Sequence, residues 1–390
     1  MGDIGFINER VDTMKLAFAT TFDARDIRNW SGTPYYMSQT LEAMGASIDY
    51  IGDLTRCLPP FFKCKQVFSK WTAGQRVSPR FNIHVAQHYS LQVAKQLKNL
   101  SVDAIIAPQI NPICYLDIKQ PIVLWTDGLY ASLLGFYPGF SEHSAETIRQ
   151  GNAITTACLS RTHLAIFSSD WAARTAIEIY GVPQEKVKVV PFGANLICNH
   201  TYEEMRTIIQ NRSRTTVKLL FLGKHWHRKG GDIVFRVARA LHERGQSVEL
   251  NFVGCSPPKE VVIPDYIKCH GFISKRSTEG VKKLNDLFYE SHFLFVPSRA
   301  EAYGIVFCEA NAFGLPCLTS YVGGISTVVK NHINGMTFSL ASSPLQYADY
   351  IIDLMQDEGR YEDLALSSFN EFVTRLNWKS AVKTVRGFLR

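Results

Sequence analysis

Two glutamates with eight-residue spacing, Glu301 and Glu309, lie in the stretch Pro297–Glu309. The apolar run His292–Val296 predicts a buried parallel strand before them, and Ile305–Phe313 predicts a helix after the turn. Ligands of open α/β sheets collect at such strand-to-helix turns. Glu309, about one turn into the helix, can accept hydrogen bonds from ribose hydroxyls. Glu301, at the strand end, can reach the group beyond the phosphates.

The turn between the two glutamates suits a bound anion. Tyr303 and Gly304 let the backbone approach a ligand closely. The amides from Tyr303 through Ile305 to Val306 lie at a helix N-terminus, where an anion is favoured. The alternative is a capped helix with two solvated carboxylates, and a lone glutamate pair would favour that alternative.

A basic loop, Lys224–Gly231, follows another apolar strand, Val217–Gly223. It carries three cations, Lys224, Arg228 and Lys229, on a strand-to-helix turn that ends in two glycines. A departing diphosphate is stabilised by fixed cations and amides of this kind. The loop lacks the G-x-x-x-x-G-K-[ST] pattern of a P-loop. A solvated basic turn is the alternative interpretation.

Together the two motifs resemble those of family 4 retaining glycosyltransferases, also described as glycosyl transferases group 1, which have the GT-B fold. Glu301 and Glu309 match the family's E-x7-E element within the pattern P-S-x-x-E-x-Y-G-x-x-x-x-E-A. The basic loop is similar to the family's G-R-L-x-x-x-K-G pattern, with Gly223 first and Lys229 near the end. The resemblance is specific from 217 to 330 and weak before residue 190.

The sequence departs from the family's pattern at two points. Lys224 stands where the family has an arginine, and a lysine cannot grip a phosphate in bidentate fashion. Arg228, next to Lys229, can supply the missing guanidinium. Asp127, at the end of the predicted strand Pro121–Thr126, stands near the point where many members have a histidine that touches the donor sugar. It is expected to contact the donor sugar or the acceptor hydroxyl, and a helix cap is its alternative.

The resemblance also implies contacts outside the two motifs. Phe272 and Ile273 lie where family members hold the nucleotide base through backbone atoms, although an ordinary apolar turn is the alternative. Gly32 and Thr33 belong to a loop that resembles the acceptor side of the family's site. A simple N-cap followed by Pro34 also explains that loop.

The roles that the resemblance implies are those of a site without a metal or cofactor. Lys224 and Lys229 stabilise the departing diphosphate with Arg228 as helper, while Glu301 orients the donor sugar and Glu309 holds the ribose. No side chain is a clear nucleophile, so the leaving diphosphate itself can take the acceptor proton. No D-x-D triplet occurs in the sequence, and the nucleotide sugar is a substrate rather than a cofactor.

Alternating strand and helix patterns predict an α/β protein of the GT-B fold, with two Rossmann-like, doubly wound domains facing a cleft. The expected boundaries are 1–195 for the acceptor-binding domain and 196–375 for the nucleotide-sugar-binding domain, and 376–390 is expected to be a helix that crosses back to the first domain. The polar segment 196–216 is interpreted as a hinge.

Composition narrows the cellular setting. Nine scattered cysteines in 390 residues argue against a disulfide framework and for a reducing cytoplasm. The N-terminus has neither the basic start nor the apolar core of a signal peptide, and no apolar run reaches the ~18 residues of a membrane span. A cytoplasmic protein is expected, with peripheral contact at the inner membrane face left open.

The positive charge is concentrated in one segment, 54–80. This segment carries six basic residues and no acid, against a net charge of +7 for the whole chain, and aromatic residues are interleaved with them. Such a segment can lie on an anionic membrane surface or contact a phosphorylated acceptor. A solvated loop with anchoring aromatics is an equally good interpretation. Nucleic-acid binding is not expected, because the basic patch is local and no nucleic-acid module is visible.

The sequence thus predicts an enzyme of the hexosyltransferase type. It would move a sugar from a nucleotide-sugar donor to a glycan, lipid-linked or small-molecule acceptor, with retention of anomeric configuration. Two alternatives stay open: a protein that binds the donor without transferring it, and a sugar-nucleotide epimerase or phosphorylase-like enzyme of the same fold.

Overall fold

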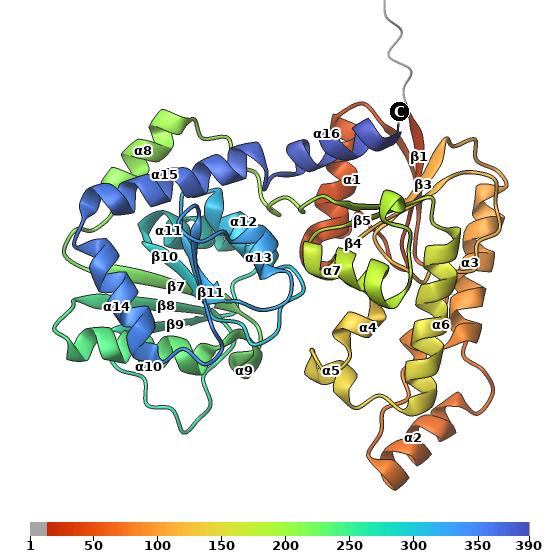
Figure 1. Ribbon diagram of the computed structural model, residues 1–390, viewed down its shortest axis with the longest axis horizontal. Coiled ribbons are helices and arrows are strands. Elements are labelled where there is room, and N and C mark those ends of the chain that lie inside the picture. Colours follow the sequence, from red (N-terminus) through yellow and green to blue (C-terminus); the bar gives the residue numbers. More distant parts are fainter. Residues whose placement is uncertain (1–13, 390) are drawn as a thin grey trace, which may run out of the picture. The chain divides into compact units, whose positions relative to one another are not determined.

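The computed structural model describes residues 14–389, which form an α/β protein with two six-stranded sheets (Figure 1). The strand orders are β2-β1-β3-β4-β5-β6 and β12-β11-β10-β7-β8-β9. The predicted absence of a signal peptide concerns residues outside the described range. No helix within 14–389 is both long enough and apolar enough to cross a membrane.

The strands are, in chain order, β1 (Lys15–Ala19), β2 (Ser47–Ile51), β3 (Ala104–Ala107), β4 (Ile122–Thr126), β5 (Leu164–Phe167), β6 (Val187–Val189), β7 (Val217–Gly223), β8 (Val248–Gly254), β9 (Ile267–Gly271), β10 (Phe293–Val296), β11 (Cys317–Ser320) and β12 (Gly335–Phe338). The register within each sheet is parallel, as the pairs β1–β2, β3–β4, β7–β8 and β10–β11 show. The α/β fold class predicted from the alternating pattern is therefore confirmed.

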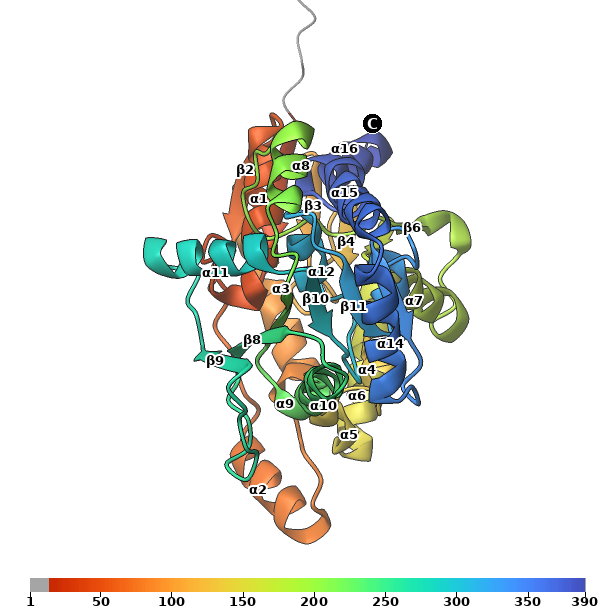
Figure 2. The ribbon, with the colours of Figure 1, turned by 90° about the vertical axis from the view of Figure 1, so that its left-hand side faces the viewer.

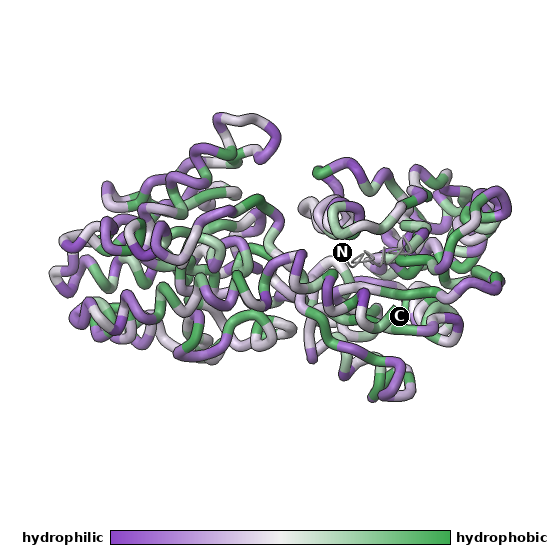
Figure 3. The backbone as a smooth tube through the Cα atoms, turned by 90° about the horizontal axis from the view of Figure 1, so that it is seen from above, coloured by the Kyte–Doolittle hydropathy of each residue, from purple (hydrophilic) through white to green (hydrophobic). Residues whose placement is uncertain are grey.

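The helices are α1 (Thr33–Ala43), α2 (Phe62–Ala73), α3 (Ile83–Leu97), α4 (Tyr130–Leu133), α5 (Pro138–Ser141), α6 (Ala145–Arg161), α7 (Asp170–Arg174), α8 (Tyr202–Gln210), α9 (Trp226–Lys229), α10 (Gly231–Glu243), α11 (Thr278–Glu290), α12 (Ile305–Asn311), α13 (Ile325–Val328), α14 (Pro344–Met355), α15 (Glu358–Thr374) and α16 (Trp378–Leu389). Hydrophobic and hydrophilic stretches alternate along them (Figure 3), as expected for helices with one buried face.

The described chain divides into two compact units. The first comprises the described residues up to Trp125 together with His143–Ala165. The second comprises Thr126–Glu142 and the described residues from Ile166 onward. The expected domain boundaries at 195 and 375 stay a prediction. All nine cysteines are free thiols in the structure.

Two segments differ from the sequence-based interpretation. Segment 54–80 contains the helix α2 rather than only a loop, and both ribbon views show α2 projecting from the rest of its unit (Figures 1 and 2). The predicted hinge 196–216 contains α8, whose N-terminus is fixed by a capping box between Thr201 and Glu204. Met205 and Ile209 are buried on its inner face. The helix α8 was not predicted, because its few apolar residues lie among charged and polar ones.

A buried arginine ties α8 to the second sheet. Arg212, just after α8, is 5% exposed and donates hydrogen bonds to the carbonyls of Phe313 (2.7 Å) and Gly314 (2.8 Å) and to the Tyr361 hydroxyl (2.8 Å). The backbone oxygen of His292, at the start of β10, accepts from the same Tyr361 hydroxyl. These bonds satisfy polar groups that would otherwise be costly to bury.

The imidazole of His292 lies in this network as a neutral ring. One ring nitrogen accepts from the Lys218 amide at 2.9 Å, and the other donates to the Ser213 carbonyl at 2.8 Å. Burial, with the positive charge of Arg212 adding to it, lowers the pKa of His292 to about 4. The folded protein therefore holds this histidine uncharged at neutral pH.

We expect stability to fall on acidification because of this histidine. The ordinary pKa is 6.5 and the folded pKa about 4, so the unfolded chain binds a proton first as the pH drops through this window. The free energy of unfolding should lose on the order of 3 kcal/mol between these values. Urea unfolding from pH 7.5 to 4.5 measures it. The same loss in His292→Gln as in the wild type would contradict the assignment, and His242→Gln, at an exposed position, serves as control.

Candidate active site

The two motif loops meet because their strands are neighbours. β10 pairs with β7 in the second sheet, in parallel, with Leu294 opposite Leu220. Both strands therefore end at the same edge of the sheet, where the loops after Gly223 and Val296 begin. This places the basic loop beside Glu301, as expected for motifs at the carboxyl ends of parallel strands.

Lys229 and Glu301 form an ion pair at this edge. The Nζ of Lys229 donates to Oε2 of Glu301, and both side chains are only 11% exposed. Arg228 approaches the same oxygen through Nη1 at 3.4 Å. Burial disfavours the charged carboxylate, but the Lys229 and Arg228 cations outweigh it, so the pKa of Glu301 lies below its usual value. Glu301 is therefore a carboxylate at neutral pH.

Two arginines hold the backbone around this ion pair through hydrogen bonds. Arg228 donates to the carbonyl of Ala300 at 2.8 Å. Arg299 makes two bonds to the Asp232 carboxylate, of 2.7 and 2.8 Å, and one to the His227 carbonyl. The bidentate contact of Arg299 joins the motif loop after β10 to the start of α10. The position of Glu301 thus depends on both loops.

Gly223, the last residue of β7, makes room for Lys229. A Cβ built at Gly223 would lie 3.0 Å from both Cβ and Cγ of Lys229 and 2.8 Å from the Phe221 ring. A larger residue would push the lysine away from Glu301. Gly223 was predicted as a donor-site residue, and the structure places it directly against Lys229.

Glu309 lies on α12 and is 3% exposed. Its Oε1 accepts from Nζ of Lys275 at 2.5 Å. Lys275 lies two residues beyond Ile273, and sequence reasoning missed it. The available signal was a cation shortly after the segment expected to hold the nucleotide base. The pairing shows that Glu309 faces the loop between β9 and α11.

Tyr303 is turned away from solvent. It is 2% exposed, and its hydroxyl donates to the Phe192 carbonyl at 2.7 Å. Only its backbone can therefore meet a ligand. Gly304 has φ of 87°, a left-handed conformation that suits glycine, and Ile305 and Val306 begin α12 half-buried.

Lys224 and Phe272, predicted for different parts of the donor, lie side by side. The Lys224 ammonium lies 5.1 Å from the centre of the Phe272 ring. Phe272 is 64% exposed, while Ile273 is half-buried. A cation over an exposed aromatic face forms a weak contact that a ligand can replace.

Asp127 and the two acceptor-loop residues have different surroundings. Asp127, just after β4, belongs to the second unit, and its charge, with that of Glu301, acts on the half-buried Tyr137 hydroxyl. Burial first, and these two carboxylates next, raise the pKa of Tyr137 above its ordinary value. Gly32 and Thr33 lie in the first unit, where Gly32 has φ of 86° before α1. Their acceptor role stays a prediction.

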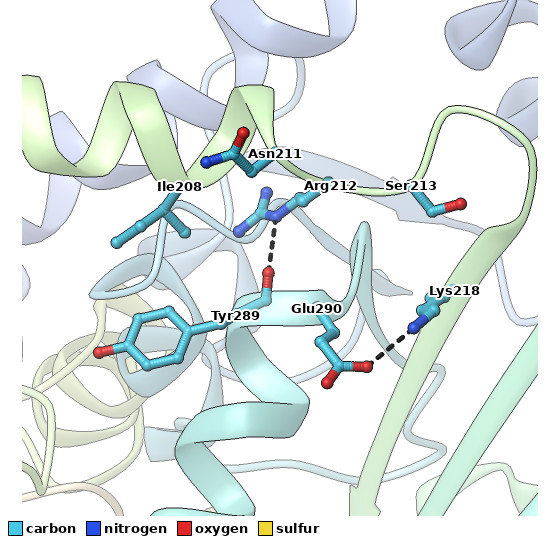
Figure 4. Close-up of a pocket in the computed structure, with 7 residues that line it drawn as sticks. All are labelled: Ile208, Asn211, Arg212, Ser213, Lys218, Tyr289 and Glu290. Carbon is cyan, nitrogen blue, oxygen red and sulfur yellow. Dashed lines mark hydrogen bonds and ion pairs between the residues drawn. The ribbon is translucent and has the colours of Figure 1, made fainter.

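A surface pocket of about 480 Å³ lies outside the motif loops (Figure 4). It is lined by Ile208, Asn211, Arg212, Ser213, Lys218, Tyr289 and Glu290. Arg212 donates to the Tyr289 carbonyl at 3.3 Å, and Lys218 pairs with Glu290 at 2.8 Å. Because its lining residues belong to neither motif, we assign the chemistry to the motif loops instead. Within 14–389, no group of three or more histidine, cysteine or acidic residues is arranged to hold a metal ion.

Comparison with known protein families bears on the same part of the chain. Residues 216–357, which include both motif loops, match the model of the family described as Glycosyl transferases group 1. Residues 216–357 are a glycosyl transferases group 1 domain. The predicted resemblance is confirmed, and Glu301, Glu309, Lys224, Arg228 and Lys229 all lie inside this domain.

Curated relatives carry matching names. The D-inositol 3-phosphate glycosyltransferase of Xylanimonas cellulosilytica is 27% identical over 228 residues, which cover 54% of this chain and 52% of that protein. A second protein of this name, from Catenulispora acidiphila, is 28% identical over 230 residues, covering 53% of this chain and 52% of its own length. The chain thus spans about half the length of the curated relatives it matches.

Solved structures share the fold over almost the whole chain. The sucrose-phosphate synthase of Thermosynechococcus elongatus aligns with a TM-score of 0.69 at 14% identity, covering 96% of this chain and 98% of that one. Anabaena HepE, solved in complex with UDP-glucose, aligns with a TM-score of 0.59 at 16% identity, covering 96% and 99%. The GT-B fold around the glycosyl transferases group 1 domain is therefore confirmed.

Proposed function

We propose that this protein is a retaining, metal-independent glycosyltransferase that moves a sugar from a nucleotide-sugar donor to a hydroxyl acceptor. The observation that carries the proposal is the convergence of Lys229 and Arg228 on the buried carboxylate of Glu301, where β7 and β10 end. Fixed cations beside a carboxylate suit a donor whose diphosphate is negative and whose sugar offers hydroxyls. The donor would be held by 196–375 and the acceptor by 1–195, including Gly32 and Thr33, with 376–390 crossing back.

The chemistry needs charge stabilisation more than a nucleophile. The bond between the anomeric carbon and the diphosphate oxygen breaks, and the acceptor oxygen bonds to the same face of that carbon. The acceptor proton passes to the leaving diphosphate, whose new charge Lys229 and Arg228 offset. Glu301, held as a carboxylate, accepts hydrogen bonds from the sugar hydroxyls and orients the ring. Glu309 would do the same for the ribose, after exchanging its contact with Lys275.

Known proteins support the donor class more than the acceptor. The Anabaena structures with UDP and with UDP-glucose support a nucleotide sugar as donor. The curated relatives are named for transfer to an inositol phosphate, which supports a hydroxyl acceptor. A glycan, a lipid-linked sugar and a small molecule all fit that description. Asp127, near the Tyr137–Glu301 region, would contact the donor sugar or this acceptor.

Replacing Lys229 should remove transfer. Lys229→Ala deletes a fixed cation from the leaving-group site, so turnover should fall by at least about 100-fold. It also leaves the buried Glu301 with Arg228 alone, which should cost on the order of 3 kcal/mol of unfolding free energy. Turnover is measured with UDP-, GDP- and ADP-sugars in EDTA, below the unfolding temperature, with circular dichroism confirming the folded state.

Lys282→Ala is the matched control, because Lys282 pairs with Asp286 on the exposed face of α11. Near-normal transfer by folded Lys229→Ala would refute the diphosphate role. Tight nucleotide binding by the wild type without transfer or hydrolysis would favour a donor-binding protein. Turnover that needs phosphate but no organic acceptor would favour an epimerase or phosphorylase-like enzyme.

We further propose that the protein is cytoplasmic and that α2 contacts an anionic membrane surface. Phe61, Phe68 and Trp71 recur at helical spacing and are 84%, 65% and 84% exposed. The basic residues of 54–80 flank them, including the exposed Lys63 and Lys70. A helix with exposed aromatics beside cations has the chemistry of an interfacial anchor.

Removing the two exposed aromatics of α2 should release the protein from vesicles. The double variant Phe68→Ser/Trp71→Ser should bind vesicles of phosphatidylcholine with phosphatidylglycerol about tenfold or more weakly than the wild type, because two large apolar groups no longer enter the interface. Co-sedimentation measures this. Tyr321→Ser removes an aromatic that is 66% exposed on the other unit and serves as control. Equal binding to neutral and anionic vesicles, or none by the wild type, would contradict the contact.

A further inference from the structure

Tyr137, between α4 and α5, acts on both sides of Glu301, directly on one and through Arg228 on the other, and belongs to neither motif. Its hydroxyl accepts a hydrogen bond of 2.7 Å from the amide of Ala302, the residue after Glu301. Its ring lies under the guanidinium of Arg228, 5.2 Å from the ring centre. Arg228 in turn holds the carbonyl of Ala300, the residue before Glu301. The peptides on both sides of the carboxylate are therefore fixed through one tyrosine.

Neighbouring contacts keep Tyr137 in place. Phe136 packs against Trp171, with ring centres 5.0 Å apart, and meets the Tyr137 ring edge-on at 5.3 Å. A Cβ built at Gly323 would lie 2.8 Å from the Phe136 ring and 2.1 Å from the Glu301 carbonyl. The segment around Tyr137 therefore packs closely against the Glu301 loop, so a shift of this segment would move the loop.

We infer that Tyr137 is a positioning residue of the donor site: its hydroxyl fixes the Glu301 loop, and its ring fixes Arg228 beside Glu301. This inference rests on the proposed function, in which Glu301 orients the donor sugar and Arg228 assists at the diphosphate. The two contacts of Tyr137 divide the work. The hydroxyl affects binding of the donor sugar through the position of Glu301, and the ring affects binding of the diphosphate through the position of Arg228.

Tyr137 does not serve as a base in this site. Burial and the nearby carboxylates of Glu301 and Asp127 raise the pKa of its hydroxyl, so the group stays protonated at working pH. Its oxygen already accepts from the Ala302 amide. The expected effects of losing it therefore concern geometry and affinity rather than a new titration in the pH profile.

Two substitutions separate the hydroxyl from the ring. Tyr137→Phe should weaken binding of the nucleotide sugar about fivefold and leave binding of the free nucleoside diphosphate nearly unchanged, because only the Ala302 bond is lost. Tyr137→Leu should weaken both, because Arg228 also loses its aromatic support. Calorimetric titration with UDP and UDP-glucose, or with the GDP or ADP pair if that binds, measures the ratio of the two dissociation constants.

Tyr180→Phe is the matched control. It removes a tyrosine hydroxyl that accepts from a backbone amide of the same segment, Ala131, at 3.0 Å, away from Glu301. Hydrogen exchange of peptides covering 298–306 adds a readout that needs no ligand. Tyr137→Phe should speed exchange there and Tyr180→Phe should not.

Unchanged exchange, or an affinity ratio equal to that of the wild type, in Tyr137→Phe would overturn the positioning role. If the wild type binds no nucleotide or nucleotide sugar, the proposed function fails instead. The exchange measurement then still decides whether Tyr137 holds the Glu301 loop.

Discussion

The burial of Lys229 against Glu301 is the constraint on which the rest of the site depends. A buried charge is tolerated only when it is paired and hydrogen-bonded, so each side chain needs the other at a fixed place. That requirement explains why Gly223 has no side chain and why Arg228 reaches across to Ala300. The fold meets the requirement simply, by pairing β7 with β10 so that both loops begin at one edge of the sheet.

The ion pair also leaves one positive charge that a negatively charged ligand could neutralise. Before any ligand binds, Glu301 neutralises one of the two cations that converge on it. In the proposed reaction, a diphosphate would meet cations already held in position, which would avoid reorganising flexible side chains. Glu309 has the same relation to Lys275 one helix turn further on. Each glutamate of the motif is thus paired with a cation of a neighbouring loop.

The strands and the loops that follow them could be predicted from the sequence, because they depend on residues close together in the chain. The buried strand β7 has the predicted bounds and β10 begins one residue later than predicted, since continuous apolar runs between turns leave few alternatives. Lys229, Glu301 and Gly223 lie together because the end of a parallel strand fixes where a loop starts. Tyr137 was missed because its contact with Ala302 arises from long-range packing that no spacing encodes. Lys275 was missed because its only signal was its place shortly after the segment expected to hold the nucleotide base. The helix α8 was missed because its charged face hid two buried residues.

Comparing the binding of nucleoside diphosphates with that of monophosphates tests the site at Lys229 most directly. Calorimetric titrations in EDTA would use UDP and UMP, with the guanosine and adenosine pairs alongside, on the wild type and on Lys229→Ala. If Lys229, Arg228 and Glu301 form a diphosphate site, one pair should bind the wild type with a preference for the diphosphate of about tenfold or more, and Lys229→Ala should lose most of that preference. The same preference in both proteins, or no nucleotide binding by the wild type, would contradict the claim that Lys229, Arg228 and Glu301 form a diphosphate site.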